Sequence, residues 1–182
     1  MDSALGELHA NTSSAADFLE NAGELSAAVS LRAMHAKTLV IAGASRLEKQ
    51  VTGAVADHVR ANVVAGNTTV IEFVEKKALF RNYHSLFDWD ARNANKFFAL
   101  FGQDFRKNVN ETIGQDVNLA DCIRSFLELG ALRNVLVHGD LLAASLDKTA
   151  DEVLSLYERA DQFAALLPTL LSAGGSLSAS PD

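Results

Sequence analysis

The sequence predicts an all-α protein, a single-domain bundle of about five or six helices. Only two prolines, Pro168 and Pro181, occur in 182 residues, so little interrupts helix formation. Apolar residues make up 48% of the chain, with alanine and leucine dominant, and they recur at spacings of three and four. That spacing is the period of a helix with one buried face. The length suits one well-packed core.

The N-terminal third predicts two helices. Residues 1 to about 23 form a short amphipathic pattern, with possible N-caps for a restart at Asn11 to Ser14 and a stop at Gly23. Residues 24 to about 62 predict one long helix that forms the backbone of the bundle. Its apolar stripe runs through Leu25, Val29, Ala33, Ala36, Val40, Gly43, Leu47, Val51, Val55 and Val59.

The middle of the chain is less regular. Residues 62–69 read as a loop, residues 70–80 are either a helical turn or two or irregular, and residues 81–90 predict a connecting segment packed against the bundle. Asp90 is a candidate cap for a helix over residues 91–101 that carries Phe97, Phe98 and Phe101 inward and closes at Gly102. Residues 103–117 are polar and predict a loop-rich stretch.

Two further helices are expected in the C-terminal part. One begins at Asn118, with Asp121 at its third position, and runs to the motif described below. The other opens at a capping box, Thr149 to Glu152, and ends near Pro168. Residues 1–171 are therefore expected to form the domain, and residues 172–182 a flexible tail.

The cysteine count and the hydropathy of the chain indicate the cellular compartment in which the protein is expected. The single cysteine, Cys122, excludes an intrachain disulfide and fits a reducing compartment. The start of the chain has no signal-peptide pattern, and no apolar run is long enough to span a bilayer. We expect a soluble cytoplasmic protein that does not interact with membranes.

Charge is unevenly distributed along the chain. The net charge is −7, which argues against general coating of nucleic acid. Residues 76–107, however, contain seven Lys and Arg residues but only three Asp residues. A locally basic, RNA-binding face is one reading, and ordinary charge scatter on a solvated surface is the other. The candidate RNA contacts are Lys76, Lys77, Arg81, Arg92 and Lys96.

The most informative stretch is residues 133–140, where Arg133 and His138 lie near a predicted helix end. Arg133 provides a permanent planar cation for phosphate oxygens, and His138 is of the residue type whose unperturbed pKa lies closest to neutrality. On a straight helix the two side chains would diverge by about 140°. Gly139 could let His138 swing off the helix axis, or residues of two protomers could meet in one cleft of a homodimer.

With Asn134 directly after the arginine, this stretch resembles the Arg-x4–6-His motif of the HEPN superfamily. Residues 43–48 and 87–93 are similar to the RiboL-PSP type, and the likeness covers about residues 25–167. The resemblance implies a helical bundle and a dimeric, metal-independent endoribonuclease of toxin–antitoxin, phage-defence or RNA-processing systems, which leaves 2′,3′-cyclic phosphate ends. It implies RNA as substrate, no cofactor, and a cognate antitoxin or defence protein as a partner.

Supporting residues and rival functions remain open at this stage. Glu48 is the first choice for a polar group that faces the motif from the long helix. Asp140 stands where related toxins have tyrosine, and it could orient His138 or merely meet solvent. Arg133 and His138 could also be ordinary helix-end cations. The non-enzymatic alternative is a module that binds RNA, a nucleotide or a partner protein without cleavage. Motifs for metal, phosphate-loop and acyl-transfer chemistry are missing, so no metal site is expected.

Overall fold

Residues 3–63, 67–80 and 82–175 are described by a computed structural model, and they contain helices but no strand, which confirms the all-α prediction. The described part has eight α-helices and one π-helical turn, more than the five or six expected, because several connecting segments are themselves short helices. The elements are α1 Ser3–Asn21, α2 Leu25–Asn62, α3 Thr68–Val74, η1 Glu75–Leu79, α4 Tyr83–Leu86, α5 Asn95–Ala99, α6 Gln103–Gln115, α7 Val117–His138 and α8 Ala150–Gly175.

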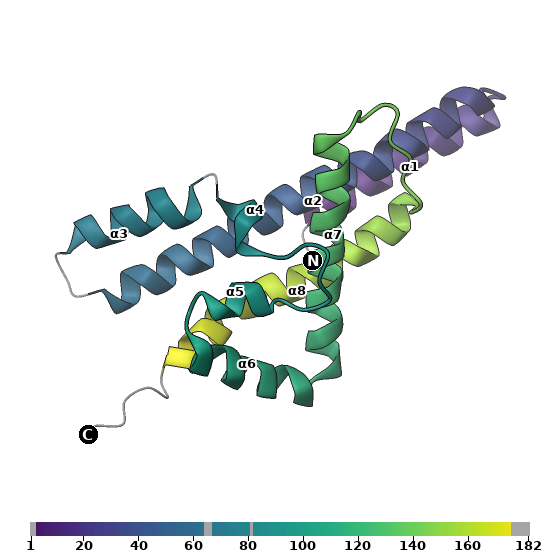
Figure 1. Cartoon of the computed structure of the whole chain (residues 1–182). Coiled ribbons are helices and arrows are strands. Elements are labelled where there is room, and N and C mark those ends of the chain that lie inside the picture. Colours follow the sequence, from purple (N-terminus) through teal and green to yellow (C-terminus); the bar gives the residue numbers. More distant parts are fainter. Residues whose placement is uncertain (1–2, 64–66, 81, 176–182) are drawn as a thin grey trace, which may run out of the picture.

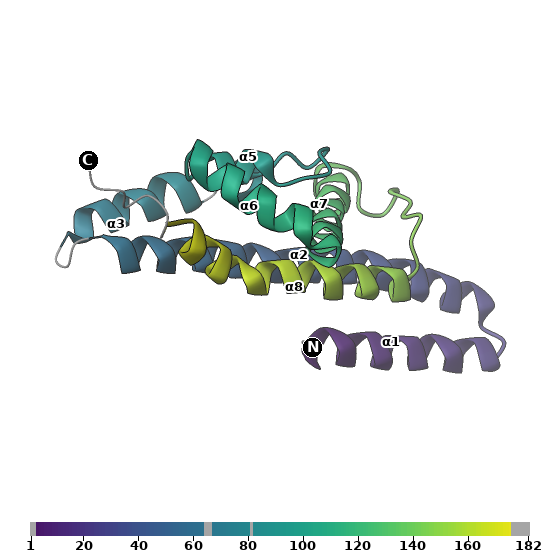
Figure 2. The same ribbon diagram turned by 90° about the horizontal axis from the view of Figure 1, so that it is seen from below.

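Helix α2 is the long central element, as the sequence predicts (Figure 1). It packs against α1, α7 and α8, while α3 folds back along its C-terminal half. Seen from below, α1 lies on one side of the layer formed by α2 and α8, and α5, α6 and much of α7 lie on the other (Figure 2). The helix that carries the Arg133 motif is therefore supported by both long helices.

The first two helices form a hairpin. Helix α1 is continuous through Asn11 to Ser14, where a restart was considered, because Leu5 and Ala16 on either side of that stretch are both buried. Gly23, at φ +86°, ends α1. Its amide donates to the carbonyl of Glu20, and the next amide donates to Leu19, which is the glycine-dependent Schellman end.

The predicted stripe of α2 is wrong at its beginning. Leu25 and Val29 are 61% and 66% exposed, whereas the stripe from Ala36 to Val55 is buried. The reason is tertiary, since the tip of the α1–α2 hairpin projects beyond α7 and α8 (Figure 1). Helical period alone does not say where the partner helices end.

The structure resolves one open alternative in the middle segment and corrects two predictions. Residues 70–79 are helical rather than irregular and form the end of α3 and the π-helical turn η1, while Phe80 is the extended C-cap residue. Helix α5 begins only at Asn95 after the N-cap residue Ala94, so Asp90 does not cap it. Residues 103–115, expected to be loop-rich, form α6, because Phe105 and Val109 lie four residues apart and bury one face of it.

Both C-terminal helices differ from the prediction at one end. Helix α7 is capped by Asp116, whose carboxylate accepts from the Leu119 amide at 3.1 Å, so it begins before Asn118. The capping box of α8 is confirmed, with the Thr149 amide 2.7 Å from the Glu152 carboxylate. Pro168 lies inside α8, which continues to Gly175 because Leu170 and Leu171 still bury against the bundle. Residues 172–175 of the expected tail are thus helical, and residues 176–182 lie outside the described part.

An aromatic cluster fills the core between α7, α8 and the middle segment. Its fully buried members are Phe87, Phe97, Phe98, Phe126 and Phe163. Phe87 stacks on Phe97 at 4.7 Å between ring centroids and tilts against Phe126 at 4.9 Å. This packing confirms that the described part of the predicted connecting segment, residues 82–90 with the short helix α4, is held on the bundle. None of the described helices has both the length and the apolar character that a membrane span requires.

Candidate active site

Helix α7 remains helical to its last residue, His138. The Gly139 amide donates to the Val135 carbonyl at 3.0 Å, an ordinary helical bond. Gly139 ends the helix as predicted, but its φ of −97° is not left-handed. The expectation that glycine lets His138 swing off the helix axis is therefore wrong. Arg133 and His138 keep their helical divergence within one chain.

Arg133 is half-buried and anchored by two neighbours. Its Nη1 lies 3.2 Å from the Asn134 Oδ1 and 3.4 Å from the Nδ1 of His84. Arginine can only donate, so the ring nitrogen of His84 must be the acceptor in this long hydrogen bond. The two contacts restrict the guanidinium to one side of α7 and leave its remaining N–H groups for a ligand.

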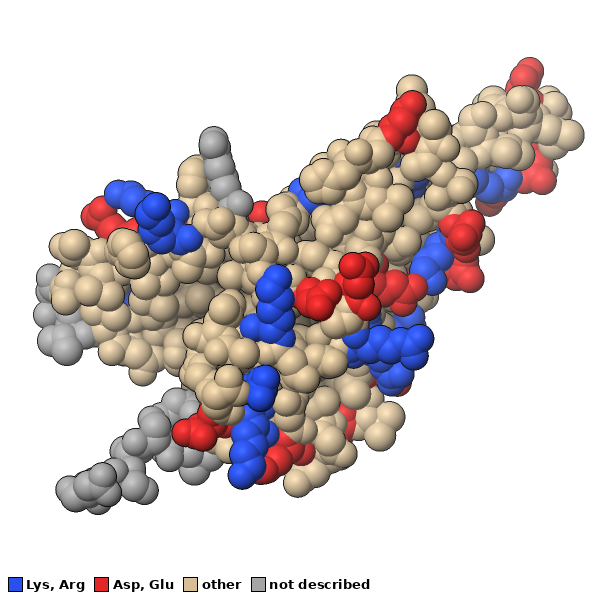
Figure 3. All heavy atoms as spheres, in the orientation of Figure 1, with Lys and Arg blue, Asp and Glu red and all other residues tan. Residues whose placement is uncertain are grey.

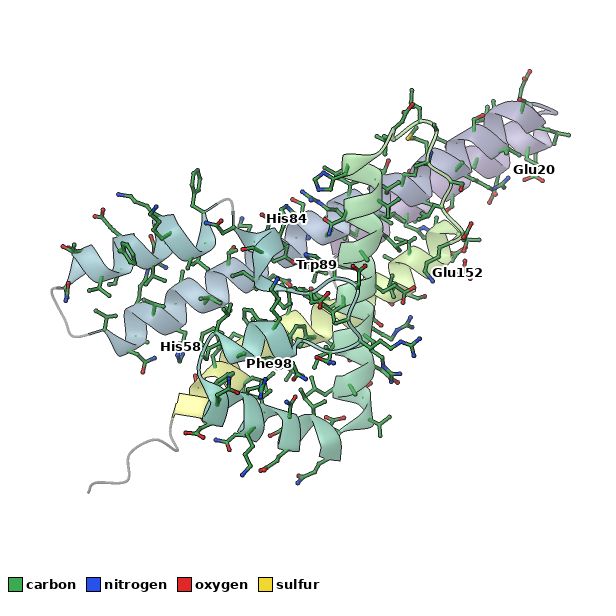
Figure 4. The ribbon with its side chains drawn as sticks, viewed as in Figure 1. Glu20, His58, His84, Trp89, Phe98 and Glu152 are labelled. Carbon is green, nitrogen blue, oxygen red and sulfur yellow. The ribbon has the colours of Figure 1, made fainter. Side chains whose placement is uncertain are left out.

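His84 is held by the short helix α4 and by Trp89. The Trp89 Nε1 donates to the His84 carbonyl at 2.8 Å, and the indole lies directly over Gly130 of α7. A Cβ at position 130 would overlap the Trp89 ring, so only glycine permits this close approach. Figure 4 shows His84 and Trp89 on the segment that lies against α7. The aromatic segment thereby fixes the ring that contacts Arg133.

Glu48 of α2 reaches the same place. Together with Tyr83, His84, Arg133 and Asn134 it lines a small cavity of about 10 Å³, which has room for about one water molecule. A substrate would have to lie on the rim of this cavity. The structure therefore places Glu48 beside Arg133 and Asn134, where the sequence suggested a supporting polar group.

The charges around this cavity change two pKa values. Burial, and then the positive charge of Arg133, lower the pKa of His84, while Glu48 opposes the shift. Burial, followed by the negative charge of Glu48, raises the pKa of Tyr83 far above its usual value. At neutral pH both side chains are uncharged, so Arg133 and Glu48 carry the charges at this site.

His138 and Asp140 lie beyond this group. His138 is exposed, and no described residue hydrogen-bonds to it, although its charge is close enough to lower the pKa of His84. The carboxylate of Asp140 accepts from the amides of Leu142 and Ala143 at 2.9 and 3.4 Å. Asp140 therefore shapes the turn after α7, and within the described part of the chain it makes no hydrogen bond to His138.

The basic residues suggested for RNA binding are dispersed. Lys76 pairs with Glu72 at 2.8 Å, Lys77 and Arg92 are exposed, and the Lys96 ammonium donates to the Phe87 carbonyl at 3.2 Å. Arg81 lies outside the described residues. Figure 3 shows separate groups of Lys and Arg over α3 and over α5 and α6, with uncharged surface between them. The visible face carries no continuous basic patch.

A groove that shares Glu48 with the small cavity reaches one of these groups. It has a volume of about 870 Å³ between α2 and the α3–η1 segment. Glu48 lies in its wall, as do Lys49, Arg60 and Lys76. Arg60 pairs with Asp57 and Glu75 at 2.8 and 2.5 Å, so the groove carries both signs of charge.

Sequence reasoning missed His84. The segment around it has no clear period, and a lone histidine among aromatics carries no sequence signal for a site. Its importance depends on a contact 49 residues away in the chain, which local patterns do not reveal. Among the described residues, no group of three or more His, Cys, Asp or Glu side chains is arranged to hold a metal ion.

Comparison with known families gives one match. The model of the RiboL-PSP-HEPN family matches residues 7–173, which is most of the chain. No curated protein and no solved structure gives a significant match.

Proposed function

Because the chain belongs to the RiboL-PSP-HEPN family, we propose that it is a metal-independent endoribonuclease whose catalytic residues are Arg133 and His138. The family match by itself supports a nuclease or an RNA-binding module. The observation that carries the finer proposal is the anchored guanidinium of Arg133, held beside the uncharged His84 and five residues before an exposed histidine.

The proposed reaction is transfer of the RNA phosphodiester to its own 2′-oxygen. A base removes the 2′-hydroxyl proton, the 2′-oxygen bonds to phosphorus, and an acid protonates the departing 5′-oxygen. The products are a 2′,3′-cyclic phosphate and a 5′-hydroxyl. The guanidinium of Arg133 stabilises the negative charge that develops on the phosphoryl oxygens. His138 is exposed, and an imidazole is the side chain that most often transfers protons in catalysis.

A homodimer would solve the geometric problem of this site. One chain presents one His138, pointing away from Arg133, but a twofold axis near the end of α7 would bring a second His138 and a second Arg133 into one cleft. One neutral histidine would then act as the base and one protonated histidine as the acid. Val135, Val137 and Leu142 are exposed apolar residues close to His138, and they offer a surface for such an interface.

Asn134 and Glu48 have supporting roles in this proposal. Asn134 accepts from Arg133, and Glu48 balances its charge across the small cavity. RNA would approach along the groove between α2 and the α3–η1 segment, where Lys49, Arg60 and Lys76 can contact phosphates. The groove contains acidic residues as well, so we expect modest affinity that weakens with salt.

The direct test incubates the purified protein with single-stranded and structured RNA in excess EDTA. We expect cleavage that leaves cyclic phosphate ends, and a loss of about 100-fold or more in both Arg133→Ala and His138→Ala. Arg124→Ala is the matched arginine control, since Arg124 is exposed on the same helix and pairs with Asp121. His58→Ala is the histidine control. Cleavage that survives both site substitutions would refute the assignment.

One observation favours the non-catalytic alternative. Arg133 and His138 are not bonded to each other, so a single chain offers an anchored cation for phosphate but no assembled acid–base pair. A module of this kind would bind RNA or another phosphorylated partner through Arg133. Binding that depends on Arg133, without cleavage by wild-type protein, would support this alternative.

A further inference from the structure

A larger cavity lies at another place in the fold, beside the α1–α2 hairpin. Its volume is about 480 Å³, and none of its lining residues belongs to the site around Arg133. It is enclosed by α1, α2, the connection between α7 and α8, and the first turn of α8. A volume of this size accommodates a small organic molecule.

Lys37 contributes a buried positive charge to this cavity. Its side chain lines the cavity although the residue is only 7% exposed. The ammonium donates to the carbonyls of Leu141 and Leu142 at 2.8 and 3.3 Å, and no carboxylate of the described residues pairs with it. One of its three N–H groups remains available. A buried cation without a counter-ion favours the binding of an anion.

The other cations around the cavity are already balanced. Arg32 contacts Asp17 and Glu20, each at 2.6 Å, and Lys148 contacts Glu128 at 2.8 Å. Lys37 is therefore the lining cation whose charge is uncompensated among the described residues.

The first turn of α8 adds donors. Thr149, Ala150 and Asp151 line the cavity at the beginning of this 26-residue helix. The capping box uses the amides of Thr149 and Glu152, while the amides of Ala150 and Asp151 have no acceptor within the helix. Free amides at a helix N-terminus bind phosphate and other anions. Here the uncompensated ammonium of Lys37 lines the same cavity.

Two histidines add a hydrogen-bond acceptor to the same cavity. The Asp151 carboxylate lies 2.9 Å from the Nε2 of His9, and the Nδ1 of His9 lies 3.2 Å from the Nε2 of His35. With both rings neutral, Asp151 accepts from His9 and His9 accepts from His35. The Nδ1 of His35 is then an unprotonated acceptor. His35 is only 4% exposed, it lines the cavity, and no described residue bonds to this nitrogen.

We propose that this cavity binds a small phosphate monoester. The phosphate would meet the Lys37 ammonium and the free amides of α8, while its P–OH group would donate to His35. A carboxylate or a sulfate ester has no proton to donate near neutral pH. A phosphate monoester has a second pKa of about 6, so about a tenth of it is the monoanion at pH 7, and this form carries the P–OH group that His35 can accept from. Ala33, Ala36 and Leu146 form an apolar wall for the organic part.

Calorimetric titration with phenyl phosphate tests this assignment, with phenyl sulfate and phenol as comparison ligands. Phenyl phosphate should bind most tightly, phenyl sulfate more weakly by about tenfold, and phenol not measurably. Lys37→Met keeps the buried stem and removes the charge, and it should weaken phenyl phosphate binding by about tenfold or more. Lys107→Met, at an exposed lysine of α6 that lines neither this cavity nor the groove beside α3, should leave binding unchanged.

A second variant, Ala33→Leu, tests the same proposal if Lys37→Met does not fold. Ala33 is exposed on α2 and lines the cavity, so Ala33→Leu should fill the cavity without disturbing the core and should abolish binding. Arg133→Ala should bind phenyl phosphate as the wild type does, which separates this site from the candidate active site. The proposal is overturned if wild type does not bind phenyl phosphate, if Ala33→Leu binds it equally well, or if Arg133→Ala loses binding.

Discussion

The residue that most alters the interpretation of the Arg133 motif is His84. Its ring accepts from Arg133, its carbonyl accepts from Trp89, and it shares a small cavity with Glu48. Burial and the charge of Arg133 keep it neutral. We regard it as a positioning residue that restricts the guanidinium, with no direct contact to the substrate assigned to it.

The lowered pKa of His84 predicts a pH dependence of stability. The usual pKa of histidine is 6.5, and the pKa of His84 in the folded protein is lower. At pH values between these two pKa values the unfolded chain therefore binds more protons than the folded one. The free energy of unfolding should be constant above about pH 7.5 and should decrease as pH falls through 6.5 towards the lowered pKa. His35, whose pKa is also lowered by burial, contributes in the same direction.

Denaturant unfolding between about pH 5 and pH 8 measures this effect. His84→Gln retains an acceptor for Arg133. It should make the free energy of unfolding depend less steeply on pH, and the remaining dependence should include the contribution of His35. An NMR titration should place the pKa of His84 below 6.5 and show that Arg133→Met raises it. An identical slope in wild type and His84→Gln would contradict the prediction.

At the scale of elements, the contact between α7 and the segment from α4 to Trp89 decides the geometry of the site. Trp89 packs over Gly130, and its ring belongs to the same cluster as Phe87 and Phe126. This contact holds α4 against α7 and thereby brings His84 to Arg133. The segment has little helical content, so its position depends on this aromatic packing.

Gly130→Ala should therefore destabilise the protein although alanine favours helices. The added Cβ would overlap the Trp89 indole, and overpacking of this kind costs about 1–3 kcal/mol. Gly53→Ala in α2 is the matched control, because a Cβ there meets nothing within 4 Å and should stabilise by up to about 1 kcal/mol. Thermal or denaturant unfolding measures both. If Gly130→Ala is as stable as wild type, the indole is not held against α7.

At the scale of the whole molecule, an acidic protein with a net charge of −7 must act on a polyanion if the proposed function is right. Long-range attraction to RNA is therefore weak, and short-range contacts from Arg133 and the groove have to provide the binding. A dimer would help by joining two such sets of contacts in one cleft. The exposed apolar residues at the C-terminal end of α7 are the natural place for that interface.

Val135→Glu tests the dimer without altering a catalytic residue. Val135 is 61% exposed near His138, so a buried charge there should shift the protein to monomers and reduce RNA cleavage together. Val117→Glu is the matched control, since Val117 is 75% exposed at the opposite end of α7 and should change neither property. Sedimentation velocity at micromolar concentration gives the readout. A wild-type protein that is strictly monomeric yet cleaves RNA would refute the composite cleft.

Helices with local sequence signals could be predicted without the structure. The long helix α2, the capping box of α8 and the glycine after His138 follow from period and capping chemistry within a few residues. The motif Arg133, Asn134 and His138 could also be found there, because residue type and spacing are sequence properties. The family match supports the resemblance that this motif suggested.

Several helix boundaries, the exposure of side chains and the contacts of His84 and Lys37 depend on tertiary packing. Pro168 stays within α8 and residues 103–115 become helical because burial outweighs weak local preferences. The exposure of Leu25 and Val29 depends on where neighbouring helices end. The contact between His84 and Arg133 links residues that are 49 positions apart in the sequence. The contact that holds Lys37 at the cavity beside α8 links residues that are more than 100 positions apart. No local pattern encodes such distances, since the free energy that fixes them comes from packing of the complete bundle.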